Sequence, residues 1–448
     1  MNIWKRIGTR NNRSALVKKN IIASFLLKGI SILISLQVVP LTISYVTPTQ
    51  YGIWLTLSSL MAWFFFFDIG LTHGFRNRFA EAKAKGDTET ARTYVSTTYA
   101  ALAIMFSGMI VFVTVVNNFI DWSKILNIDS AYRQELSQVF LIIVSFFGLN
   151  VVFSTFTTML TADQKPALQS MIQVMGQAMA FVVIYLLTII SMGGSLYTLA
   201  FVFSGIPVTV VLLSSIFFFN TKYKDVAPAF RYIKFGYVKN ILGLGSEFFV
   251  ITTSMLFIFN LMNIIISRIL GPETVTEYNI AYKYFSVLYM FMVLILNPFW
   301  SAFTDAYTKK DYVWMKAMFG KLERLWFMTI PLLLLMYITA PYFYQFWIED
   351  AVAISVSTNI SVAVYILFLT FGNIYMYMIN GIGKVRIQLI IYASFVFISY
   401  PVMNFMCSHW GISGLLIVPT IVYIFQGILG RLQLKKILCG KASGIWNK

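Results

Sequence analysis

The stretch TYVSTTYAALAIMFSGMIVFVTVVN, residues 93–117, decides the fold class of this chain. It contains no Asp, Glu, Lys or Arg over its whole length. At about 1.5 Å per residue, a helix of this length is long enough to cross a hydrocarbon core roughly 30 Å thick. Such a run predicts a transmembrane helix.

Similar runs fill most of the chain, which is 58% hydrophobic and 11% charged with a mean hydropathy of +0.76. The period-two alternation of a transmembrane barrel is not their pattern. We therefore predict an all-α integral membrane protein with about twelve transmembrane helices. The twelve expected segments are 20–46, 51–74, 93–117, 136–161, 167–192, 195–220, 239–270, 278–303, 325–348, 355–380, 385–407 and 411–434.

The distribution of basic residues predicts the orientation of these helices. With the N-terminus inside, 29 of the 34 Lys and Arg fall in the tails and even-numbered loops, four fall on the other side, and Lys28 lies within a helix. This asymmetry follows the positive-inside rule. We expect a multi-pass protein of a bacterial inner membrane with both termini cytoplasmic. The formal charge of +17 does not indicate nucleic-acid binding, because the basic residues are spread over seven cytoplasmic segments.

The two halves of the sequence resemble each other at an offset of 224 residues. FRNRFAEAKAKGD, residues 75–87, aligns with FWSAFTDAYTKKD, residues 299–311, and Pro48 aligns with Pro272. An even number of helices per repeat gives both halves the same orientation, related by a pseudo-two-fold axis along the membrane normal. We predict two six-helix bundles, residues 1–220 and 221–448, with residues 221–238 as a cytoplasmic linker and a cavity between the bundles.

The sequence offers no catalytic or metal-binding constellation. His73 and His409 are predicted on opposite sides of the membrane, and no His, Cys and Asp cluster has metal-ligand spacing. The segment Gly381-Ile-Gly-Lys384 lacks the earlier Gly and the following Ser or Thr of an ATPase phosphate loop. We expect no enzyme, no metal and no cofactor, and any transport to be secondary or passive.

Three ionisable residues lie inside predicted helices at one common depth: Lys28, Asp68 and Glu247. A charge near the bilayer centre costs at least about 2.5 to 3.5 kcal/mol unless it faces a cavity or a partner. Lys28 is a candidate phosphate-binding cation in the cavity, and Asp68 and Glu247 are candidate sites for a coupling ion. The alternative is a structural ion pair between Lys28 and Asp68.

Three further cations are candidate substrate ligands. Arg268 and Lys283 are predicted toward the periplasmic side of the seventh and eighth helices, where they could receive an anionic head group late in transfer. Snorkelling to the interface is the alternative. Arg76 follows the second helix and could collect phosphates at the cytoplasmic mouth, or be an ordinary positive-inside charge.

An ordered set of short motifs resembles the polysaccharide-transport family of bacterial O-antigen and lipid-linked oligosaccharide flippases. The resemblance extends over about residues 20–434. The motifs are Tyr51-Gly52-x-Trp54, Asp68-Ile-Gly-Leu71, Gly74-x-Arg76-Asn77, Ala80-x-Ala82-x-Ala84-x-Gly86-Asp87, Ala91-Arg92-x-Tyr94-x-Ser96-Thr97, Gly271-Pro-Glu273, Tyr278-Asn279, Lys283, Asn297-Pro-Phe-Trp300 and Asp311.

The resemblance implies the fold of the multidrug, oligosaccharidyl-lipid and polysaccharide exporter superfamily, with a cationic lumen. The implied substrate is a polyprenyl-pyrophosphate-linked oligosaccharide carried to the periplasmic leaflet by alternating access. The implied partners are membrane lipids, this substrate and other polysaccharide-assembly proteins. Glu247 departs from a uniformly cationic cavity. A multidrug antiporter of the same superfamily and a membrane glycosyltransferase or polymerase are the alternatives.

Overall fold

A computed structural model describes residues 26–64, 71–163, 165–190, 193–242, 254–255, 258–349 and 351–447. Every regular element in these ranges is a helix. Nine helices of the described ranges are long and apolar enough to cross a membrane. The protein is therefore an all-α membrane protein, as the apolar runs predict.

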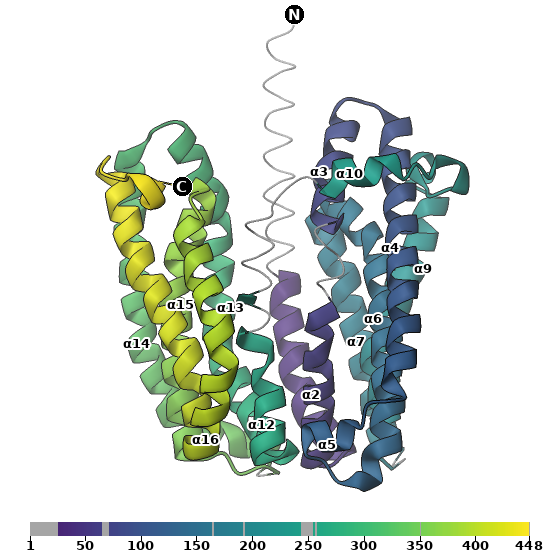
Figure 1. Ribbon diagram of the computed structural model, residues 1–448, viewed down its shortest axis with the longest axis vertical. Coiled ribbons are helices and arrows are strands. Elements are labelled where there is room, and N and C mark those ends of the chain that lie inside the picture. Colours follow the sequence, from purple (N-terminus) through teal and green to yellow (C-terminus); the bar gives the residue numbers. More distant parts are fainter. Residues whose placement is uncertain are drawn as a thin grey trace, which may run out of the picture. The chain divides into compact units, whose positions relative to one another are not determined.

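The chain forms two compact units, and the first contains the described residues within Met1–Val46, Phe64–Trp122 and Ala131–Leu244. In this unit α6 packs against α4, α7 and α9, and α3 packs against α4 and α6 (Figure 1). Its helices are Leu26–Tyr45, α3 (Leu71–Ala84), α4 (Thr88–Asn117), α6 (Arg133–Ala162), α7 (Pro166–Ile189), α8 (Leu196–Ala200), the π-helix η3 (Phe201–Gly205), α9 (Ile206–Asn220) and α10 (Gly236–Leu242), with the short turns η4 (Lys224–Val226) and η5 (Phe230–Tyr232).

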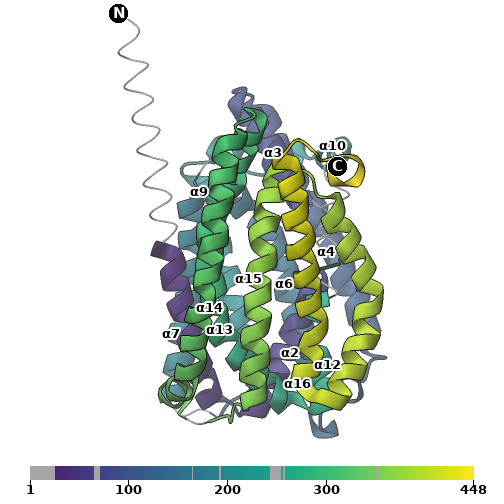
Figure 2. The ribbon, with the colours of Figure 1, turned by 90° about the vertical axis from the view of Figure 1, so that its left-hand side faces the viewer.

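The second unit contains the described residues within Thr47–Trp63, Ser123–Ser130 and Gly245–Lys448. Its central helix is α15, which packs against α13, α14 and α16 (Figure 2). Its helices are α2 (Pro48–Phe64), most of α5 (Trp122–Leu126), α12 (Met262–Leu270), α13 (Pro272–Thr308), α14 (Tyr312–Ile348), α15 (Val356–Ile382), α16 (Arg386–Leu438) and η6 (Gly444–Asn447), and η2 (Ser130–Tyr132) lies at the boundary of the units.

Helix α16 contains the last two predicted segments. Its backbone leaves helical geometry at Trp410 (φ −127°, ψ 16°) and Gly411 (φ 59°, ψ −143°). A positive φ is readily adopted only by glycine, so Gly411 permits the break. The break lies between the predicted segments 385–407 and 411–434.

Positions that repeat in the sequence have the same local role in both halves. Pro48 and Pro272 are the first residues of α2 and α13, where proline's missing N–H costs nothing. Asp87 caps α4 by accepting a hydrogen bond from Thr90 N at 2.9 Å, and Asp311 caps α14 by accepting one from Trp314 N at 3.0 Å. The weak repeat therefore preserves helix starts.

Helix α2 belongs to the second unit although it comes from the first half of the sequence. A Cβ atom at Gly52 would lie 1.7 Å from the carbonyl oxygen of Pro272, so only glycine allows this approach. Thr276 Oγ1 donates to Pro48 O at 2.6 Å, and Ser267 Oγ donates to Leu126 O at 2.9 Å. The units thus follow packing and not chain order, and the assignment of 1–220 and 221–448 to six-helix bundles stays a prediction.

Candidate functional site

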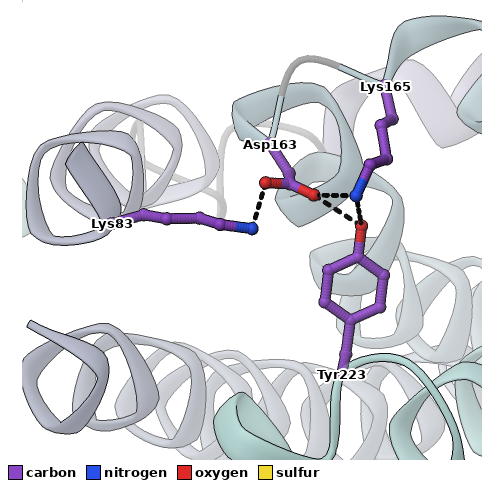
Figure 3. A network of polar contacts seen from close by, with 4 residues as sticks. All are labelled: Lys83, Asp163, Lys165 and Tyr223. Atoms are coloured by element: carbon purple, nitrogen blue, oxygen red, sulfur yellow. Dashed lines mark hydrogen bonds and ion pairs between the residues drawn. The ribbon is translucent and has the colours of Figure 1, made fainter. Parts of the chain in front are cut away.

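Four polar side chains form a cluster at the helix ends of the first unit that are predicted to be cytoplasmic (Figure 3). Asp163 follows α6 and accepts hydrogen bonds from Lys83 Nζ through Oδ1 and from Lys165 Nζ through Oδ2. The Tyr223 hydroxyl donates to Asp163 Oδ2 at 2.6 Å and accepts from Lys165 Nζ at 2.7 Å. One carboxylate therefore joins α3, the loop between α6 and α7, and the segment after α9.

Asp163 is the electrostatic centre of this cluster. Its side chain is 8% exposed, whereas those of Lys83 and Lys165 are 44% and 33% exposed. Burial alone raises the pKa of the Asp163 carboxyl, but the hydrogen bonds from Lys165, Lys83 and Tyr223 outweigh it and hold the pKa below its ordinary value. Burial, followed by the hydrogen bond to Asp163, raises the pKa of the Tyr223 hydroxyl, which therefore stays a donor.

The segment that follows α9 is bound along the N-terminal part of α4. Arg92 Nε donates to Ala227 O at 2.8 Å, and the Arg92 guanidinium lies 4.6 Å from the centre of the Tyr232 ring. The backbone N–H of Ala229 donates to Ser96 Oγ at 3.1 Å. The predicted linker is thus held against the first unit by specific polar contacts.

Lys283 of the second unit lies on α13, eleven residues from the start of this helix. Helix α13 begins at Pro272 and not near Tyr278, because Gly271, with φ 94°, ends α12 and proline starts the next helix at once. Eleven residues at 1.5 Å each place Lys283 about 16 Å from the start of α13, close to the middle of the span Pro272–Asn297. Substrate binding by Lys283 and its snorkelling alternative both stay predictions.

No acidic side chain compensates Lys283 within the described residues. The side chain is half-buried, and its ammonium makes no hydrogen bond or ion pair with any described residue. Asn279, Lys283 and Ser286 are spaced i, i+4 and i+7, so they share one face of α13. Asn279 Nδ2 also donates to Asn263 Oδ1 at 2.9 Å. A polar stripe with one free cation therefore runs along α13.

Tyrosines adjoin this stripe inside the second unit. The ring centre of Tyr282 lies 5.9 Å from that of Tyr278 and 6.3 Å from that of Tyr365. Tyr365 lies 6.0 Å from Tyr423, and Tyr392 donates to Gln426 Oε1. Tyr278, Tyr365, Tyr392 and Tyr423 are buried, so these rings, which combine an apolar body with a hydroxyl, form a tyrosine-rich interior.

Arg268 is an exposed cation in the last turn of α12. Its guanidinium donates one hydrogen bond, from NH1 to the Tyr400 hydroxyl at 3.1 Å, and has no carboxylate partner in the part of the chain that the structure describes. Both residues line a cavity of about 280 Å³ whose other walls are apolar.

The remaining candidates are separate from these groups or lie outside the description. Lys28 is exposed on the helix Leu26–Tyr45 and has no ion pair with a described residue, and Arg76 is exposed on α3. Asp68 and Glu247 lie outside the described residues. Within the described ranges, no group of three His, Cys, Asp or Glu side chains could hold a metal ion.

Comparison with known proteins identifies the family. The family model described as polysaccharide biosynthesis protein matches residues 17–302. The chain belongs to this polysaccharide biosynthesis family. A Salmonella typhi protein described as "Putative O-antigen transporter" is 22% identical over 389 residues, which cover 82% of this chain and 84% of that protein.

Solved transporter structures share the fold of this polysaccharide biosynthesis family member. An inward-facing multidrug resistance MATE transporter of the MOP superfamily superposes with a TM-score of 0.71 at 14% identity, covering 94% of this chain and 96% of that one. An outward-facing MATE transporter gives 0.66 at 13% identity, with 96% of each chain covered. Identities this low show the fold alone. The predicted polysaccharide-transport family is confirmed by the family model, and the proteins that this chain resembles are described as transporters and not as enzymes.

Sequence reasoning missed the Asp163 cluster and Tyr400. The members of the cluster are far apart in the chain, and Arg268 and Tyr400 are separated by 132 residues. The spacing of Tyr278, Tyr282 and Tyr289 on α13 was the available signal for the tyrosine-rich interior, because these positions fall on one side of a helix.

Proposed function

We propose that this protein carries a polyprenyl-pyrophosphate-linked oligosaccharide from the cytoplasmic to the periplasmic leaflet of a bacterial inner membrane. Membership of the polysaccharide biosynthesis family and the transporter fold support a polysaccharide-related cargo. The orientation with both termini cytoplasmic comes from the distribution of Lys and Arg.

The argument for the proposal starts from the ammonium of Lys283 on α13, which has no acidic partner among the described residues and which we place near mid-membrane. An uncompensated cation at this depth costs about 2.5 to 3.5 kcal/mol, so a protein keeps one where an ion or substrate passes. The polar stripe of Asn279, Lys283 and Ser286 supplies donors and acceptors, and the nearby tyrosines supply rings and hydroxyls. This chemistry fits an anionic diphosphate attached to a sugar.

The role of Lys283 follows from the cost of moving the cargo. Phosphates and hydroxyls lose several kcal/mol each when they leave water for hydrocarbon without replacement partners. Lys283 neutralises part of the diphosphate charge at the deepest point of the path, and the Asn279 amide and the Ser286 hydroxyl replace water at the sugar. Alternating access then exposes this site to one side of the membrane at a time.

Reconstitution into vesicles with a fluorescent lipid-linked oligosaccharide tests the proposal. The measured quantity is the rate at which the sugar becomes protected from, or accessible to, a membrane-impermeant reagent. This rate should be higher in vesicles with wild-type protein than in empty vesicles. Lys283→Gln should slow transfer at least tenfold, Lys283→Arg should retain part of it, and the matched exposed-lysine control Lys316→Gln should transfer like wild type. Equal kinetics with and without wild-type protein would contradict the proposed function.

The same vesicles separate this function from the multidrug alternative, which the shared fold also accommodates. Cationic dye uptake that depends on an ion gradient, with no transfer of the lipid-linked sugar, would favour a drug exporter. A cationic drug gains nothing from an ammonium in the path, because like charges repel. Lys283→Gln would then leave dye transport unchanged or faster.

A further inference from the structure

One face of α12 combines an apolar stripe with a single cation at its end. Leu261, Ile264, Ile265 and Arg268 are spaced i, i+3, i+4 and i+7, and all four line the cavity of about 280 Å³. Arg268 is two residues from the end of α12, whereas Leu261 is about 10 Å deeper along the axis. The stripe thus runs from an interface-level cation toward the bilayer interior.

The other residues that line the cavity are also apolar away from Arg268 and polar beside it. Leu60 of α2 and Ile125 of α5 add apolar surface, and the Tyr400 hydroxyl lies beside the guanidinium. Ile125 is 43% and Tyr400 40% exposed, so the cavity is accessible from outside the unit. All of these residues belong to the second unit.

The guanidinium of Arg268 is available to an anion. It uses one of its five N–H donors on Tyr400 and has no carboxylate partner among the described residues. Arginine presents its remaining donors as a planar fork that matches two phosphate oxygens. The Tyr400 hydroxyl can donate to a third oxygen when the phosphate replaces it as the partner of Arg268.

We infer that this cavity binds the phosphate end of a single-chain lipid phosphate, with the phosphate on Arg268 and Tyr400 and the first part of the chain along Leu261, Ile264 and Ile265. The volume of the cavity lies just below the roughly 300 Å³ at which pockets for whole drug-sized ligands begin. It therefore holds a phosphate head group and the start of one lipid chain, but no oligosaccharide. One apolar stripe on one helix offers a path for one chain, which favours a polyprenyl phosphate over a two-chain phospholipid.

This inference rests on the proposed function for the origin of the lipid. The end of α12 that carries Arg268 is predicted to be periplasmic. A cation there would hold the lipid phosphate after the sugar has crossed, at a site separate from Lys283. The cavity therefore acts as an exit subsite for the lipid-linked end of the cargo.

Equilibrium binding to the purified full-length protein in detergent tests this site without any transport. The probe is farnesyl phosphate, compared with farnesol, inorganic phosphate and phosphatidylglycerol. Saturable binding of farnesyl phosphate is expected, with weaker binding of the other three. Arg268→Gln should raise its Kd at least about tenfold, because a charge-assisted hydrogen bond is lost, and Tyr400→Phe should raise it about threefold.

Two further variants complete the design. Arg268→Lys keeps the charge without the planar fork and should bind with intermediate affinity, which guards against a folding defect in Arg268→Gln. Arg133→Gln is the matched control, since Arg133 is also predicted to be periplasmic but pairs with Asp121 at 3.4 Å. It should bind like wild type.

Equal affinities of wild type and Arg268→Gln for farnesyl phosphate would overturn the inference, as would binding of phosphatidylglycerol at equal strength. Binding that follows the expected pattern in a protein that transfers no lipid-linked sugar would contradict the proposed function and leave the subsite standing.

Discussion

The lysines of the Asp163 cluster in the first unit and Lys283 in the second unit have opposite surroundings. In the first unit Lys83 and Lys165 share the carboxylate of Asp163 and a tyrosine hydroxyl at the helix ends. In the second unit Lys283 lies near mid-span with no acidic partner among the described residues. Two lysines share one carboxylate in the first place, whereas Lys283 has no carboxylate among the described residues in the second.

This contrast separates structural charges from functional ones. A cation whose donors are satisfied within the protein has little left to offer a ligand, and its removal weakens the fold. A cation without a partner in the membrane destabilises the protein and is retained for what it binds. Mutations in the Asp163 cluster should therefore lower stability. Mutations of Lys283 should instead reduce transport and leave stability unchanged or raise it.

Asp163→Asn should have the largest effect on stability. The substitution removes the charge between two ammonium groups and leaves the shape of the side chain. Because Asp163 is nearly buried but both lysines are partly exposed, we expect a loss of about 2 kcal/mol, below the cost of breaking a fully buried pair. Thermal unfolding in detergent measures the loss. The control Glu81→Gln removes an exposed carboxylate and should change little. An unchanged unfolding temperature for Asp163→Asn would contradict the structural role.

The contribution of Asp163 should also depend on pH in one direction. Burial raises its pKa, but hydrogen bonds from Lys165, Lys83 and Tyr223 bring the pKa below the ordinary value near 3.9. A carboxyl with a lowered folded-state pKa stabilises the fold above the unfolded-state pKa, and this contribution is lost as the pH falls through the folded-state pKa. The advantage of wild type over Asp163→Asn should stay constant from about pH 7 to 5 and shrink below about pH 4. If the difference in stability between wild type and Asp163→Asn stayed constant down to pH 3, the charge of Asp163 would not be the source of its stabilising effect.

Lys283→Met should have a smaller effect on stability, and in the opposite direction. It replaces an ammonium that pairs with no described residue by an apolar side chain of similar length, so the unfolding free energy should equal that of wild type or exceed it by up to about 1 kcal/mol. The same variant should lose transfer of the lipid-linked sugar. Unfolding in detergent and the vesicle assay are run on one preparation. A destabilisation as large as that of Asp163→Asn would place Lys283 among the structural charges.

The fold was predictable from the sequence to the extent that it depends on local patterns. Runs such as residues 93–117 gave correct membrane helices, and α4 ends at Asn117 as predicted. The start of α13 was predicted too late, because Glu273 and Glu277 lower the hydropathy of a segment that is nevertheless helical. The depth of Lys283 in the membrane stays a prediction.

The side-chain groupings were less predictable, for a physical reason. The contact of Asp163 with Lys83 and Tyr223, and that of Arg268 with Tyr400, join residues distant in sequence. The hydrophobic periodicity of the sequence predicts which face of a helix is apolar, but it does not predict which other helix packs against that face. Arg268 and Lys283 could be named as unusual charges, whereas their different surroundings required the structure.

Lys28→Ala should have the smallest effect on stability. The side chain of Lys28 is exposed, and it pairs with no described residue. Removing such a side chain changes the unfolding free energy by less than about 0.5 kcal/mol. If Lys28 attracts the pyrophosphate in the cavity, transfer should nevertheless slow, by less than in Lys283→Gln because water in the cavity screens an exposed cation. Raising the salt concentration should then reduce the difference between wild type and Lys28→Ala. Wild-type transfer by stably inserted Lys28→Ala protein would remove Lys28 from the path and leave Lys283 as the cation that the cargo meets inside the membrane.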